Sequence, residues 1–204
     1  MKVLLINGSP HREGNTSRAL REVAASLEKE GIETVEEWIG TQAVQGCIGC
    51  YKCMELGRCV FHDELYERLL RLLPEIDGLV IGSPTYYAGP NGALCALLDR
   101  LFYSAGKHLK YKPGAAVAVA RRGGASTTFD RLNKYFTILS MPVVSSQYWN
   151  MAYGRAPGEV EGDGEGMQTM RTLGTNMAWL LHKIHASAPL HPEAESPVRT
   201  NFIR

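Results

Sequence analysis

The residues best suited to chemistry in this chain are four closely spaced cysteines, in the pattern Cys47-x2-Cys50-x2-Cys53-x5-Cys59. A [4Fe–4S] cluster needs four thiolates that converge on one cube, and a CxxCxxC run can supply three of them from one tight loop. Cys59 is near enough to supply the fourth. Structural zinc usually joins two separated CxxC pairs, so it suits this spacing less well. A set of free or reversibly oxidised thiols is the other alternative, and the pattern leaves it open.

A second group of polar residues follows the first apolar run, in Gly8-Ser9-Pro10-His11-Arg12-Glu13-Gly14-Asn15-Thr16-Ser17. This turn has neither the GxGxxG nor the GxxxxGK[ST] pattern, which argues against a dinucleotide site and a nucleotide hydrolase. A cluster of short polar side chains at a helix start can instead bind a phosphate, because free N–H groups and the helix dipole favour an anion there. The candidate ligands are Ser9, Asn15, Thr16 and Ser17, with His11 at the rim. An ordinary helix cap by Asn15 or Thr16 would use the same residues.

Two further loops predict a site for a flat heteroaromatic ring. Pro84, Thr85, Tyr86 and Tyr87 follow a continuous apolar run, and backbone N–H groups there could bind the polar edge of a ring. The tyrosines could equally cover the end of the sheet. Arg121-Arg122-Gly123-Gly124 follows the next apolar run. Its glycines allow close approach of the backbone to a ligand, and its arginines offset negative charge.

These loops need a scaffold of alternating strands and helices. Strands are predicted at 2–7, 32–39, 77–82, 115–120 and 143–148, and helices at 16–30, 63–73, 93–104, 127–139 and 167–186. Loops are expected at 83–92 and 150–166. This order predicts an α/β fold, a doubly wound parallel sheet of five strands with helices on both faces. Ligands of such sheets bind at the carboxyl ends of the strands, where the three loops should meet.

Composition limits the classes of partner. The chain has 22 basic and 21 acidic residues, and a net charge of +1 gives no basic excess for nucleic acid or an anionic membrane. No apolar run approaches the roughly 20 residues of a membrane span. Val3–Ile6 is too short for a signal peptide, so a cytoplasmic location is expected. We predict one domain at 1–186, with a cysteine-rich insertion at 41–62, and an irregular tail at 187–204.

Together the segments GSPHREGNTS, DGLVIGSPTYY and GALCALLDRLFY resemble the NADPH-dependent FMN reductase family of flavodoxin-like proteins. With its cysteine segment, the chain looks like the iron–sulfur flavoproteins of that group, which carry a compact cysteine motif of this kind. The resemblance implies non-covalent FMN, with its phosphate on Ser9, Asn15, Thr16 and Ser17. Its isoalloxazine would lie against Pro84 to Tyr87, flanked by Arg121 to Gly124. His11 departs from the Arg or Lys of many relatives, and the third loop departs in having two arginines.

The resemblance also implies a homodimer or homotetramer in which a neighbouring subunit can complete the flavin site. The expected function is an FMN oxidoreductase or electron-transfer protein. NAD(P)H or a ferredoxin-type protein would donate electrons, and a small molecule or protein would accept them. No catalytic side chain is assigned, because the cofactor carries the chemistry. The alternative is a non-catalytic FMN-binding redox sensor whose cysteines are free and reactive.

Overall fold

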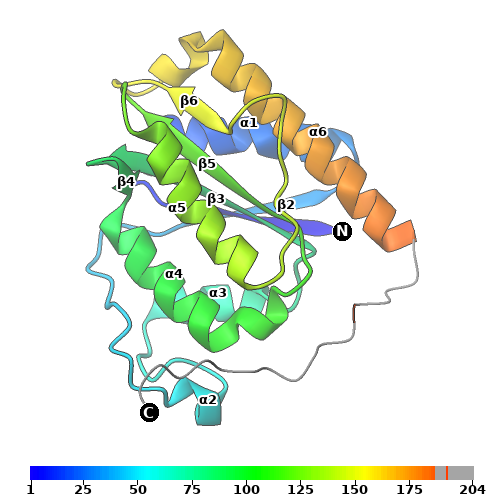
Figure 1. Cartoon of the computed structure of the whole chain (residues 1–204). Coiled ribbons are helices and arrows are strands. Elements are labelled where there is room, and N and C mark those ends of the chain that lie inside the picture. The colour runs from blue at the N-terminus through cyan, green and yellow to red at the C-terminus, as the bar shows by residue number, and fades with distance from the viewer. Residues whose placement is uncertain (187–191, 193–204) are drawn as a thin grey trace, which may run out of the picture.

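A parallel sheet forms the centre of the computed structural model, which describes residues 1–186 and 192 (Figure 1). Its strand order is β2-β1-β3-β5-β6, in which β1 pairs with both β2 and β3. This is the flavodoxin-like order, whose direction of winding reverses between β1 and β3. The parallel strands are β1 (Lys2–Asn7), β2 (Glu33–Trp38), β3 (Gly78–Tyr86), β5 (Gly114–Ala120) and β6 (Met151–Tyr153).

Helices cover both faces of this sheet (Figure 1). Val3 and Leu5 of β1 point into a core shared with one pair of helices, whereas Leu4 and Ile6 point into the core on the opposite face. This alternation is what a strand buried on both faces requires. The first face carries α1 (Asn15–Lys29) and α6 (Gly164–Ala186), and the second carries α3 (Glu64–Leu72), α4 (Gly92–Ala105) and α5 (Ala125–Ile138).

Short elements complete the described chain. The tip of β3 turns back into β4 (Gly89–Pro90), which pairs antiparallel with Thr85 and Tyr86. The cysteine segment contains one turn of helix, α2 (Cys53–Leu56). Two 3-10 turns follow, η1 (Gly106–His108) after α4 and η2 (Glu159–Gly162) before α6.

The predicted fold class is confirmed, but one strand was predicted in the wrong place. The structure places the fifth parallel strand at 151–153 rather than at 143–148. The chain does touch β5 near Val143, in an isolated bridge to Gly114, and then leaves the sheet. Ser146 hydrogen-bonds through its hydroxyl to the backbone of Tyr148, a local bond that competes with strand pairing.

Two predicted loops also contain regular structure. The 83–92 region continues β3 and forms the β3–β4 hairpin, and 150–166 holds β6 and η2. Apart from Pro192, the expected tail at 187–204 lies outside the described residues. Among the residues that the structure describes, no helix is both long enough and apolar enough to cross a bilayer.

Candidate functional site

A cavity of about 380 Å³ opens at the carboxyl ends of the strands, where the winding of the sheet reverses. Four loops contribute to it, those that follow β1, β3, β5 and β6. Its lining residues are Ser9, His11, Gly14, Asn15, Thr16, Pro84, Thr85, Tyr86, Val119, Arg121, Gly154, Arg155 and Pro157. The volume lies within the range of about 300–1,000 Å³ that is common for small-molecule sites.

The first loop presents an uncapped helix start to this cavity. Gly14 is the N-cap residue of α1, and no side chain hydrogen-bonds to the first turn as a cap. Asn15 and Thr16 therefore do not act as ordinary N-cap residues. The N–H groups of the first turn remain available to an anion, which the helix dipole also favours.

The hydroxyl groups of the first loop are not equivalent. Ser9 and Thr16 are buried residues on the cavity wall, and Ser9 Oγ accepts a hydrogen bond from the backbone N–H of His11. Ser17 is also buried, but its hydroxyl donates to Glu36 on β2 over 3.0 Å, and Ser17 does not line the cavity. The structure thus separates Ser17 from the other predicted phosphate ligands.

Buried amides hold the loops in place. Asn7 accepts a hydrogen bond from the N–H of Ser9 and donates to the carbonyl of Arg12. Asn91, at the start of α4, donates to the carbonyl of Gly8 over 2.8 Å. Neither residue was predicted to belong to the site, although their places beside the two predicted loops were a usable signal.

The β3–β4 hairpin contributes Pro84, Thr85 and Tyr86 to the cavity. Thr85 Oγ1 is buried and has no hydrogen-bond partner within the described part of the chain. Buried hydroxyls are normally paired, so this atom points to a ligand group. Tyr87 lies at the hairpin tip with a φ of +49°, fully exposed and outside the lining.

The loop after β5 contributes one of its two arginines. Arg121, Arg122 and Gly123 are all exposed, but only Arg121 lines the cavity. Gly124 has a φ of +85° and packs against the hairpin, since a Cβ there would lie 2.8 Å from Cα of Ala88. Gly124 therefore shapes the site without lining it.

The fourth loop lies within the predicted loop 150–166, but none of its residues was predicted to belong to the site. Gly154, Arg155 and Pro157 line the cavity, and the loop is tied to α1 through Asn15. Asn15 Nδ2 donates to the carbonyl of Ala156 over 2.9 Å, and Asn15 Oδ1 accepts from the N–H of Val160. Correct placement of β6 would have indicated that this loop belongs to the site, because the loop directly follows a strand end.

The four clustered cysteines line a separate and smaller hollow of about 20 Å³ against α4. All are free thiols, with Cys47 and Cys50 exposed and Cys53 and Cys59 partly buried. Burial raises the pKa of Cys53, and charge on Cys50, Cys47 and Cys59 raises it further. Within the described residues, no group of three or more potential ligands is arranged to hold a metal ion.

The thiols do not adjoin the cavity within this chain. The segment leaves the carboxyl end of β2 as predicted, but it then runs along α4 to α2 (Figure 1). No lining residue is shared by the cysteine hollow and the cavity. The rim that carries the loops therefore holds the start of the segment and not its thiols.

Comparison with known proteins decides the family. The family model described as NADPH-dependent FMN reductase matches residues 1–156. The chain belongs to this family. An iron-sulfur flavoprotein of Methanocaldococcus jannaschii is 39% identical over 186 residues, covering 87% of this chain and 96% of the relative. An iron-sulfur flavoprotein of Archaeoglobus fulgidus is 29% identical over 197 residues, covering 96% and 87%.

A solved structure supports the fold of this FMN reductase family member. RosB, with a bound riboflavin-phosphate intermediate, has a TM-score of 0.72 at 20% identity, and the match covers 100% of this chain and 94% of RosB. At that identity the likeness shows the flavodoxin-like fold alone.

The chemistry of the cavity suits the FMN that the family name implies. The uncapped start of α1 and the hydroxyls of Ser9 and Thr16 suit a phosphate, and the unpartnered Thr85 Oγ1 suits a polar ring edge. The cavity wall described here includes two arginines, Arg121 and Arg155, and no carboxylate. These residues fit a negatively charged cofactor.

The cysteine hollow suits an iron–sulfur cluster by its donor set. Four thiols line one hollow whose remaining walls include the apolar side chains of Ile48, Val60, Phe61 and Tyr103. Thiolates in a mainly apolar setting are the ligands that iron–sulfur clusters use. A hollow of about 20 Å³ would have to widen around the cluster.

Proposed function

We propose that this member of the FMN reductase family is an FMN-dependent oxidoreductase. The observation that supports this most strongly is the single cavity in which four strand-end loops assemble an uncapped helix start, an unpartnered buried hydroxyl and two arginines. FMN, when bound, accepts a hydride or single electrons and passes electrons onward.

In this proposal the chain binds and orients the cofactor. The N–H groups of α1, together with Ser9, Asn15 and Thr16, hold the phosphate. Pro84, Thr85 and Tyr86 support the ring, and Arg121 and Arg155 offset its negative charge. His11 is exposed at the rim, where it can contact the phosphate side of the ligand.

The donor is tested by anaerobic mixing of the FMN-loaded protein with NADPH, NADH or a reduced ferredoxin. We expect at least one donor to bleach the flavin absorbance, at a rate no slower than steady-state turnover with the same donor. Membership of an NADPH-dependent family makes NADPH the first candidate. Failure of all three donors would favour a second candidate function, a redox sensor. The observation that supports this candidate is that the thiols of Cys47 and Cys50 are free and exposed.

We further propose that Cys47, Cys50, Cys53 and Cys59 hold one [4Fe–4S] cluster, which supplies one-electron transfer when bound. The support is the shared hollow and the two relatives that are named iron-sulfur flavoproteins. Four unpaired thiols also suit a reducing compartment such as the cytoplasm. A homodimer or homotetramer would bring the thiols of one subunit to the cavity of another, which a single chain does not achieve.

The cluster is tested by iron and sulfide analysis after anaerobic reconstitution. We expect about four irons and four sulfides per chain, on the stoichiometry of the cluster. Cys50→Ala should abolish iron binding and leave FMN bound, because the cavity is built from other loops. Cys95→Ala is the matched control, since Cys95 lies on α4 outside the hollow and should keep its iron. Wild-type protein without iron would overturn the cluster proposal.

A further inference from the structure

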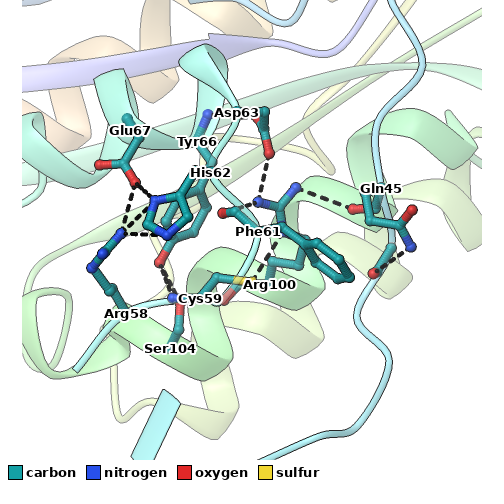
Figure 2. A network of polar contacts seen from close by, with 11 residues as sticks. Gln45, Arg58, Cys59, Phe61, His62, Asp63, Tyr66, Glu67, Arg100 and Ser104 are labelled. Atoms are coloured by element: carbon teal, nitrogen blue, oxygen red, sulfur yellow. Dashed lines mark hydrogen bonds and ion pairs between the residues drawn. The ribbon is translucent and has the colours of Figure 1, made fainter. Parts of the chain in front are cut away.

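Arg100 on α4 is a charged residue whose side chain is completely buried. A guanidinium stays charged in proteins, so its burial is costly unless each N–H group finds a partner. Here it stacks on the ring of Tyr66, with Cζ 4.8 Å from the ring centroid, and approaches Phe61 at 5.6 Å. The polar partners of this side chain all lie in or directly after the cysteine segment, residues 41–62 (Figure 2).

The partners of Arg100 bracket the cysteines. Nη1 donates to the carbonyl of Gln45 over 3.2 Å, two residues before Cys47. Nη2 donates to the carbonyl of Phe61 over 3.1 Å, two residues after Cys59. The same Nη2 lies 2.6 Å from Oδ2 of Asp63, the N-cap residue of α3. One side chain on a long helix therefore ties both ends of the segment together.

The fourth polar contact of Arg100 reaches a thiol directly. Arg100 Nε donates to Cys59 Sγ over 3.4 Å (Figure 2). The backbone N–H of Cys59 is also held, by the hydroxyl of Tyr66 at 2.9 Å. Cys59 is thus fixed at both its backbone and its sulfur, while Cys47 and Cys50 are exposed.

We propose that Arg100 is the positioning residue of the cysteine segment. It closes the segment at Gln45 and Phe61 so that the four thiols face one hollow, and it places a positive N–H donor on the sulfur of Cys59. This inference rests on the proposed cluster. A donor and a positive charge on a cluster sulfur stabilise the reduced, more negative state, so Arg100 raises the reduction potential.

Two variants of Arg100 test this role. Arg100→Met removes the charge and all donors at similar length, and Arg100→Lys keeps the charge but cannot make all four polar contacts. Arg68→Met is the control, because Arg68 on α3 pairs with Glu37 and Glu64 and touches no cysteine. Each protein is compared in cluster potential, in iron content and, without metal, in amide hydrogen exchange.

We expect Arg100→Met to speed exchange at 45–61 at least tenfold while α1 and α6 stay protected. The cluster that this variant still binds should have a lower reduction potential. We expect the redox equilibrium to shift about tenfold, which corresponds to about 59 mV for one electron. Arg100→Lys should recover part of the potential, and Arg68→Met should match the wild type. The proposal would be overturned if Arg100→Met left both the cluster potential and the amide exchange at 45–61 unchanged. If Arg100→Met does not fold, wild-type potential and wild-type exchange in Arg100→Lys would overturn it.

The exchange measurement separates this inference from the cluster proposal. If the wild type takes up no iron, the cluster proposal fails by itself. Fast exchange confined to 45–61 in the metal-free Arg100 variant then still supports the closing role of Arg100 on a segment of free thiols. Wild-type exchange in that variant would refute the role without reference to iron.

Discussion

At the scale of single residues, the first loop shows how two adjacent hydroxyls take different tasks. Thr16 and Ser17 are neighbours at the start of α1, and both were predicted to be phosphate ligands. The structure places Thr16 on the cavity wall and turns Ser17 toward Glu36. Sequence spacing could not distinguish them, because the direction of each side chain depends on the packing of α1 on the sheet.

Substitution of these two residues should therefore have different effects on FMN binding. Thr16→Ala removes a donor to a charged group, worth about 1.5–3 kcal/mol, and should raise the Kd for FMN at least about tenfold. Ser17→Ala is the matched control and should leave the Kd within about twofold. Calorimetric titration of the apoprotein measures both. Equal losses would place the phosphate elsewhere on the loop.

Removal of the Thr85 hydroxyl should leave the apoprotein equally or more stable and should weaken FMN binding. This buried hydroxyl has no partner among the described residues, a state that costs about 1–3 kcal/mol without ligand. Thr85→Val keeps the shape and removes the hydroxyl, so apoprotein stability should stay equal or rise by about 1 kcal/mol. The Kd for FMN should rise about tenfold because one ligand contact is lost. Weaker apoprotein with unchanged FMN binding would show that the hydroxyl serves the fold.

At the scale of elements, the regular helices and the buried strands were predictable because their apolar patterns are strong. α3 and β5 lie within one or two residues of the predicted ranges. The fifth strand was not predictable, since β6 has three residues and an exposed Tyr153. A tertiary contact decides its place, for the N–H of Ala118 donates to the carbonyl of Asn150. The error also concealed that the loop carrying Gly154 and Arg155 belongs to the site.

The contact between the β3–β4 hairpin and the loop after β5 can be tested at one glycine. Gly124→Ala would force a side chain into a left-handed conformation, at about 1–2 kcal/mol, and against the backbone of Ala88. We expect the unfolding free energy to fall by at least about 1–2 kcal/mol and FMN to bind more weakly. Gly123→Ala is the control, because a Cβ at Gly123 meets no atom within 4 Å, and it should change stability by less than about 0.5 kcal/mol. Equal effects of the two substitutions would argue against this contact.

At the scale of the whole molecule, the pH dependence of stability should reflect Tyr135 on α5. Burial and a hydrogen bond to Asp99 raise the pKa of this phenol above its ordinary value. The folded protein then keeps a proton that the unfolded chain releases above about pH 10. The unfolding free energy should therefore fall as the pH rises past that value. Chemical denaturation at several pH values should show a flatter fall for Tyr135→Phe. The control Tyr148→Phe, at an exposed position, should leave the fall unchanged. An unchanged fall in Tyr135→Phe would show that Tyr135 does not cause the pH dependence.

The whole molecule keeps two centres apart within one chain. The cavity lies at the carboxyl edge of the sheet, and the thiols lie against α4 in a hollow with different lining residues. The sequence predicted both sets of residues, but it could not show how far apart they lie, because a segment with so little regular structure has no predictable path. Figure 1 shows that path beside α4.

The proposed function depends above all on a cofactor phosphate held at the uncapped start of α1. The most direct test is calorimetric titration of the apoprotein with FMN and, separately, with riboflavin, which has the same ring and no phosphate. We expect one FMN per chain, bound at least about tenfold more tightly than riboflavin, since a charged hydrogen bond alone contributes about 1.5–3 kcal/mol. Equal affinities for the two ligands, or no FMN binding, would contradict a phosphate site at the start of α1.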